Sequence, residues 1–165
     1  MSTVRNSSAV VLGLFLSANA LAADTCALLS RPDAAAVLGQ PVTTVIPAGP
    51  ERDDDSGGQL SYCTYAASKA AIVLSVVEFA TAAEARKQLS ANLVKERMDE
   101  EDAKVTEEPG IGEKSFWGVS EHGASFTFLK GSRVVSLGLG GAAGAQAAGR
   151  KDALRRAALS VAGKL

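Results

Sequence analysis

Apolar and polar residues alternate along several stretches of the chain, with the two-residue period of a β-strand. The clearest alternation covers residues 59–66 and 70–79, which are separated by a turn near Ser68. Weaker strand patterns lie at residues 42–46, 104–106, 114–118, 124–130 and 133–138. Residues 47–58 predict an exposed loop. Because tight turns such as Lys130-Gly131-Ser132 join consecutive strands, we expect antiparallel pairing.

Helix start and stop signals interrupt these strands. Ser30 can cap a short helix over residues 32–38, and Gly39 suits its end. A second helix starts at Thr81, with Glu84 at the position that completes a capping box. Its apolar stripe and its length predict an amphipathic helix that ends near residue 98.

A third helix is predicted over residues 145–162. Its apolar residues recur at spacings of four, three and four positions, at Leu154, Ala158, Val161 and Leu165. The sequence therefore predicts an α+β domain in which helices pack on a curved antiparallel sheet. The order of elements also suggests a pseudo-repeat of helix plus three strands.

The first 22 residues are typical of an export signal. Arg5 provides the positive charge, residues 9–16 form a short apolar run, and Ala20-Leu21-Ala22 matches the small-x-small cleavage pattern. The apolar run is about half of the roughly 20 residues that span a bilayer, so we expect cleavage after Ala22 and no stable membrane insertion. The two polar residues before Cys26 argue against lipid attachment there. We expect a periplasmic or secreted protein.

The mature chain, residues 23–165, is long enough for a single domain, and no linker divides it. Its two cysteines, Cys26 and Cys63, would meet an oxidising compartment, where a pair normally forms a disulfide. A redox or nucleophilic thiol is the alternative, but the C-x-x-C spacing is missing and no activating base lies nearby in the sequence. We therefore expect the disulfide.

Charge and composition exclude several functions. The chain has 17 basic and 18 acidic residues, so removal of Arg5 leaves 16 against 18, a net charge of −2. This balance argues against a nucleic-acid-binding protein. The single histidine, His122, lies in a predicted turn and cannot build a multi-histidine zinc site. We expect no metal and no cofactor.

Two acidic runs remain after these exclusions. Asp53-Asp54-Asp55 only partly resembles the start of a calcium loop, which leaves weak cation binding open. Residues 99–108 are rich in Asp and Glu and predict a solvated connection, with a docking surface for a basic partner as the alternative.

The glycine-rich run at residues 138–144 follows a predicted strand and precedes a predicted helix, as a dinucleotide-binding loop would. A nucleotide-binding βαβ unit needs a further parallel strand and an acidic residue after that helix, and the chain contains neither before Leu165. We interpret the run as a flexible strand-to-helix loop.

Several short motifs are similar to those of small secreted bacterial domains of unknown function. They are the Cys-Ala-Leu-Leu-Ser start at Cys26, the Ala-Ala-Ala-Val-Leu-Gly helix end, Tyr62-Cys63-Thr64-Tyr65, and Pro109-Gly110-Ile111-Gly112-Glu113. Those domains resemble the fold of the PsbP-type photosystem accessory proteins and are often lipoproteins, although the lipidation motif is missing here. The resemblance implies a fold and a broad binding role. It implies no reaction.

We expect a non-enzymatic binding or accessory module of the cell envelope, because no set of nucleophile, base and orienting residue can be assembled. Its partner would be an unknown envelope protein or a small apolar ligand. Trp117 and its neighbour Phe116 are the candidate ligand-binding residues, since aromatic side chains dominate binding hot spots and one of two adjacent strand residues would be partly exposed.

The alternative function is a small serine hydrolase with a Ser-Lys pair. The candidates are Ser68 with Lys69 and Ser115 with Lys114. Neighbouring residues on a strand point to opposite faces, which makes these pairs geometrically poor.

Overall fold

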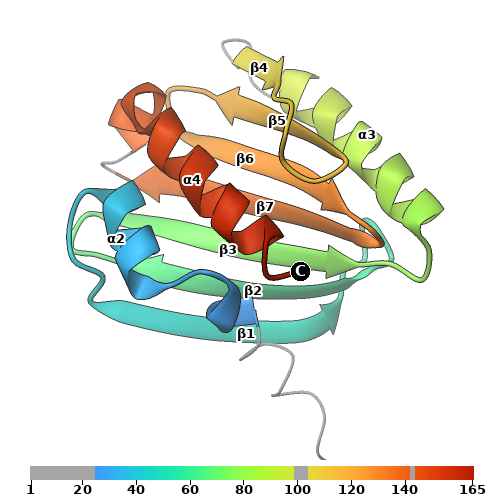
Figure 1. The fold of residues 1–165 in the computed structure, drawn as a ribbon, viewed down its shortest axis with the longest axis horizontal. Helices are drawn as coiled ribbons and strands as arrows, with labels where there is room; N and C mark the ends of the chain where they lie inside the picture. The colour runs from blue at the N-terminus through green and yellow to red at the C-terminus, as the bar shows by residue number, and fades with distance from the viewer. Residues whose placement is uncertain (1–24, 99–103, 142–143) are drawn as a thin grey trace, which may run out of the picture.

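Seven strands form one antiparallel sheet within the described part of the chain (Figure 1). The structure is a computed structural model that describes residues 25–98, 104–141 and 144–165. The strands are β1 (Thr44–Arg52), β2 (Gln59–Ala66), β3 (Ala70–Glu78), β4 (Lys104–Glu107), β5 (Lys114–Val119), β6 (Gly123–Lys130) and β7 (Arg133–Gly141). The helices are α2 (Arg31–Leu38), α3 (Ala82–Met98), the 3₁₀-helix η1 (Gly144–Arg150) and α4 (Lys151–Ala162). The α+β class is therefore confirmed.

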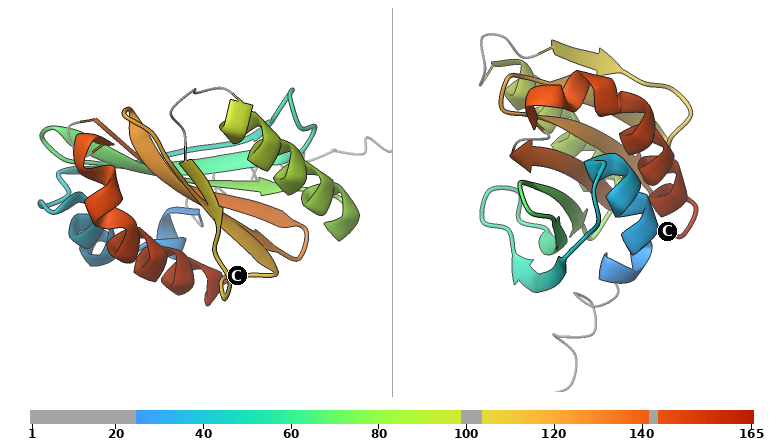
Figure 2. Two further views of the ribbon diagram at one scale, coloured as in Figure 1. Left: turned by 90° about the horizontal axis from the view of Figure 1, so that it is seen from above. Right: turned by 90° about the vertical axis from the view of Figure 1, so that its left-hand side faces the viewer.

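The strand order across the sheet is β1-β2-β3-β7-β6-β5-β4, so the two halves of the chain meet where β3 pairs with β7. Helices α2 and α4 lie on one face, here called the covered face, and α3 lies on the other, here called the open face (Figure 2). The pseudo-repeat stays a prediction. In each half of the chain a helix comes before the strands. Helix α3 follows the strands of the first half and α4 follows those of the second half, but these two helices lie on opposite faces of the sheet.

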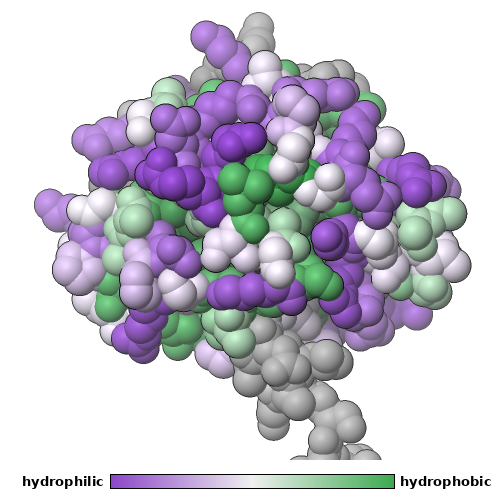
Figure 3. Space-filling model, in the orientation of Figure 1, coloured by the Kyte–Doolittle hydropathy of each residue, from purple (hydrophilic) through white to green (hydrophobic). Residues whose placement is uncertain are grey.

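The main hydrophobic core fills the covered face. One row of core side chains crosses five neighbouring strands and consists of Cys63, Leu74, Leu137, Phe126 and Trp117. Helix α4 contributes Leu154, Ala158 and Val161, three residues of the predicted stripe, and all three are fully buried. The outer surface over α2 and α4 is mainly hydrophilic, with small separated apolar patches (Figure 3).

The predicted helix caps are present. The Ser30 hydroxyl accepts a hydrogen bond from the Asp33 amide at 3.2 Å, and α2 ends at Gly39 with a φ of 69°. At the start of α3, the Glu84 amide donates to the Thr81 hydroxyl and the Thr81 amide donates to the Glu84 carboxylate. These reciprocal bonds form the capping box that the sequence predicts.

The predicted loop at residues 47–58 is wrong over its first part, because residues 47–52 belong to β1. β1 is an edge strand, so its prolines remove no hydrogen bond from a second neighbour. The pairing with β2 is irregular between Ala48 and Glu51. Gly49 has a φ of 88°, and a Cβ there would lie 2.5 Å from the Leu60 carbonyl oxygen, so this bulge requires glycine.

The end of the second half also differs from expectation. β7 continues to Gly141 because its last residues pair with β3 and β6, so the interpretation of residues 138–141 as a flexible loop is wrong. The predicted third helix starts as the 3₁₀-helix η1 before α4 begins at Lys151, and the poor helix former Gly149 lies in that first part.

Some expectations lie outside the described residues. They concern the export signal at residues 1–22 and the first part of the acidic run, residues 99–103. Among the described helices, none combines the length and apolar character needed to cross a membrane.

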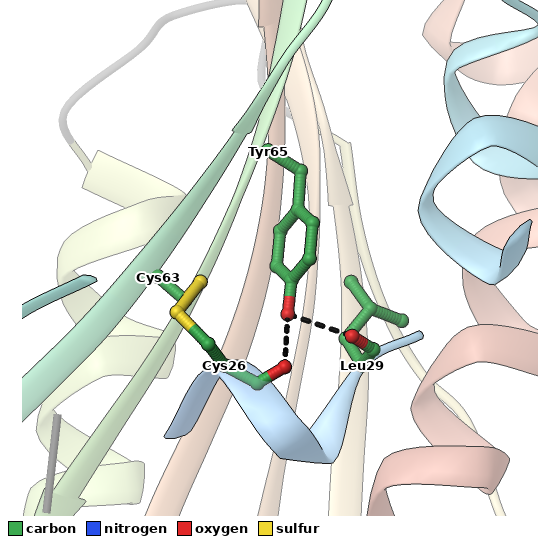
Figure 4. The surroundings of a disulfide bond; sticks show 4 residues. All are labelled: Cys26, Leu29, Cys63 and Tyr65. Carbon is green, nitrogen blue, oxygen red and sulfur yellow. Dashed lines mark hydrogen bonds between the residues drawn. A yellow bond between two sulfur atoms is a disulfide. The ribbon is translucent and has the colours of Figure 1, made fainter. Parts of the chain in front are cut away.

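The predicted disulfide joins Cys26 to Cys63, with 5.2 Å between their Cα atoms (Figure 4). Beside it, the Tyr65 hydroxyl lies 2.7 Å from the carbonyl oxygens of both Cys26 and Leu29. The Tyr65 side chain is buried, and this burial raises its pKa to about 12. The disulfide and the tyrosine together hold the start of the described chain against β2.

We predict that replacing Cys26 and Cys63 together by alanine lowers the free energy of unfolding by about 4 kcal/mol, because the disulfide closes a loop with a sequence separation of 37 residues. Urea unfolding of the oxidised protein and of the double variant measures the difference. Equal stabilities would show that the bridge does not restrict the unfolded chain.

We predict that Tyr65→Phe lowers the free energy of unfolding by about 1–3 kcal/mol near neutral pH, because two carbonyl groups lose their hydroxyl donor. The unfolded tyrosine ionises near pH 10 but the folded one only near pH 12, so this advantage of the wild type is complete below pH 10 and declines as the pH rises towards 12. Urea unfolding of both proteins near pH 7 and near pH 11 tests this, with Tyr62→Phe as the control. A constant difference would contradict it.

Candidate functional site

The open face of the sheet is only partly covered. Helix α3 buries Ala85, Leu89 and Leu93 against Phe116 and Leu129 at one end of this face. Beside α3 the sheet is hollowed into a cavity of about 1040 Å³, here called the groove. Its floor is formed by β3, β7, β6 and β5, and its polar and charged lining residues are Lys69, Asn92, Ser120, His122, Ser125, Thr127 and Ser136. A volume of this size is sufficient for a small-molecule ligand.

Glycines shape the floor of the groove. Gly138 on β7 lies between Val73 on β3 and Ser125 on β6, and Ser125 in turn faces Gly118 on β5. The next row contains Gly140. A Cβ atom added at Gly138 or Gly140 would meet no other atom within 4 Å. The groove therefore exists because side chains are missing at these positions of a central strand.

The alternation of β7 explains why this hollow does not weaken the core. Leu137 and Leu139 point to the covered face and are buried at 0% and 3% exposure. The residues between and after them, Gly138 and Gly140, point to the open face. One strand thus provides large side chains to the core and bare backbone to the groove.

Hydroxyl groups lie at the inner end of the groove. Thr127 on β6 faces Ser136 on β7, and their hydroxyl oxygens are 2.8 Å apart. Thr127 is only 4% exposed. Two hydroxyls carry two hydrogens, and one hydrogen bond uses one of them. The other hydrogen has no acceptor within the described part of the protein, so it can be donated to a bound molecule.

A lysine and a histidine lie at the opposite end of the groove. Lys69, in the turn before β3, and His122, in the turn before β6, are both exposed. The His122 Nε2 atom is 3.3 Å from a Glu121 carboxylate oxygen. Lys69 forms no ion pair with any described residue, and the described lining of the groove contains no Asp or Glu.

The structure places the predicted ligand-binding residues in two different cores. Trp117 packs against Phe126 under α4, with 6.3 Å between ring centroids, while Phe116 lies under α3. They are 4% and 0% exposed, so the expectation that one ring is partly exposed is wrong. Both faces of β5 are covered, so adjacent residues are buried on opposite sides. Neither ring lines the groove.

The residues of the alternative Ser-Lys pairs have other partners. The Ser68 hydroxyl donates to the Gln40 amide oxygen at 3.0 Å. The Ser115 hydroxyl is buried and donates to the Glu108 carbonyl, and Lys114 pairs with Glu107 instead. The structure thus brings neither serine hydroxyl to its neighbouring lysine.

Other candidate groups are dispersed. Asp54 and Asp55 are exposed in the turn between β1 and β2, and no cluster of three or more metal-ligating side chains occurs in the described ranges. His122 occupies the predicted turn, and its backbone amide donates to the Ser120 hydroxyl. This bond shapes the turn and does not join the imidazole to a nucleophile.

Sequence reasoning missed Gly138, Gly140, Ser125 and the other floor residues. The available signal was the alternation Ser136-Leu137-Gly138-Leu139-Gly140, which has the period of a strand with one bare face. Glycine is a frequent turn residue and a weak strand former, so the same pattern also predicts a loop.

No family model matches the chain, and no curated protein matches it either.

Proposed function

We propose that the protein is an exported, non-enzymatic binding module of the cell envelope, periplasmic or secreted, and that it holds a small, mainly apolar ligand in the groove. The observation that carries this proposal is the bare glycine floor in the centre of the sheet. The solvated face of an antiparallel sheet commonly carries polar side chains, whereas Gly138 and Gly140 leave the centre of this face bare. Here one face is left open over a cavity of about 1040 Å³.

Export is supported by the leader pattern in the sequence and by the disulfide, which persists in oxidising compartments. The resemblance to PsbP-type accessory proteins stays a prediction that rests on sequence motifs alone. A binding role is favoured over a Ser-Lys hydrolase because the candidate serines donate their hydrogen bonds to Gln40 and to the Glu108 carbonyl.

The chemistry of the groove limits the ligand. Its floor offers glycine and alanine backbone and the Val73 side chain, so most of the contact is apolar. A few hydroxyls and the Asn92 amide supply the polar contacts that orient a ligand in such a site.

We predict that Gly138→Phe weakens binding of phenylnaphthylamine, an uncharged fluorescent probe for apolar sites, by at least about tenfold. The ring would lie in the open space above the floor, where a Cβ meets no atom within 4 Å. We expect unchanged or slightly higher stability, because glycine is unfavourable in a strand.

The matched control is Gly149→Phe, which adds the same ring at an exposed position outside the groove. Fluorescence titration of the three oxidised proteins gives the dissociation constants, and urea unfolding checks the fold. If the wild type does not bind the probe, or binds it as well after Gly138→Phe, the groove is not the binding site.

A further inference from the structure

The floor of the groove has the shape of a plate. Between the row of Ser136 and the row of Gly140, β7 advances four residues, which corresponds to about 13 Å. Across the sheet, the floor extends over β3, β7, β6 and β5, and three strand spacings correspond to about 14 Å. A floor as wide as it is long fits a flat ring system better than a single extended hydrocarbon chain.

The glycine rows also allow unusually close approach. At Gly138 and Gly140 no side chain stands above the peptide planes, so a planar molecule can reach van der Waals contact with the backbone. Val73, which is 36% exposed, provides an apolar edge beside Gly138.

Charge distinguishes the two ends of the groove. Lys69 lies at the end of the groove where β7 ends, and its backbone is close to that of Gly141. A Cβ added at Gly141 would lie 2.7 Å from the Lys69 carbonyl oxygen. Its ammonium group has no carboxylate partner among the described residues, and His122 lies at the same end next to Glu121. Lys69 therefore favours an anionic group at this end.

A hydroxyl donor lies at the other end. Whichever of Thr127 and Ser136 donates to the other, one hydroxyl hydrogen remains without an acceptor in the described structure. Thr127 is 4% exposed, Ser136 is partly exposed, and both line the groove, so this hydrogen lies on the wall of the groove. It would be satisfied by an acceptor atom on a bound molecule.

We propose that the ligand is a flat, mainly apolar ring system that carries one anionic group, with its rings on the glycine floor and its anion beside Lys69. This inference rests on the proposed function, because it names the class of ligand for the same groove. Lys69 is then a specificity-determining residue, and the glycine floor selects for planarity.

The test compares two probes that share one ring system. Anilinonaphthalene sulfonate carries an anionic group, and phenylnaphthylamine lacks it. We expect the wild type to bind the sulfonate more tightly, and we expect Lys69→Met to weaken sulfonate binding by about fivefold, the effect of one nearby charge in a solvated site. Binding of the uncharged probe should stay within about twofold, and added salt should reduce only the preference for the anion.

The control Lys130→Met removes an exposed lysine at the opposite end of the sheet and should change neither affinity. Gly138→Phe should weaken both probes. In competition, a naphthalene carboxylate should displace the sulfonate more effectively than laurate, a linear carboxylate of the same charge.

Each negative result would overturn a different part of the proposal. If neither probe binds, the proposed function itself is wrong. If the uncharged probe binds but the sulfonate gains nothing from Lys69, the anionic part of the inference is overturned while the groove stands. Better competition by laurate would overturn the planar part. Sedimentation showing a dimer that Gly138→Phe dissociates would identify a second copy as the occupant and overturn the proposed ligand.

Discussion

The register between β3 and β7 is the constraint on which the rest of the structure depends. These strands join the two halves of the sheet along nine paired positions, from Ala70 opposite Gly141 to Glu78 opposite Arg133. A slip of one residue would send every side chain of a strand to the other face. Leu137 and Leu139 would then leave the core, and Gly138 and Gly140 would line it. The core and the groove are thus two consequences of one register.

The unequal coverage of the two faces follows from this division. Helices α2 and α4 cover a face of large side chains, and the disulfide with Tyr65 fixes the start of the described chain on the same side. On the open face, α3 packs at one end of the sheet against the large side chains of Phe116, Leu129 and Val134. Over the groove the floor consists mainly of small residues such as Gly138, Gly140 and Ser125, which give a helix little apolar area to bury. The groove lies where the open face has too little apolar area for a helix to pack on.

Local signals in the sequence predicted most of the elements. Ser30, Gly39, Thr81 and Glu84 act through neighbours in the sequence, so their roles could be recognised without tertiary information. The strand at residues 59–66 was predicted with its observed bounds for the same reason, and the disulfide followed from compartment and cysteine count. Other features that depend on distant partners were not predicted. β1 tolerates its prolines only because it is an edge strand, and the burial of Trp117 and Phe116 depends on which helix covers each face of β5.

Two pairs of glycines in this chain differ in whether folding requires glycine, and the difference bears on the site. At Gly49 and Gly112, the backbone has a positive φ and a Cβ would lie 2.5 Å or 2.1 Å from a carbonyl oxygen, so folding itself requires glycine. At Gly138 and Gly140, neither condition holds, and a larger side chain would have room. Each glycine within a strand costs about 0.5–1 kcal/mol relative to alanine. Folding gives no reason for this cost at Gly138 and Gly140, whereas the proposed ligand, lying directly on the backbone, would give one.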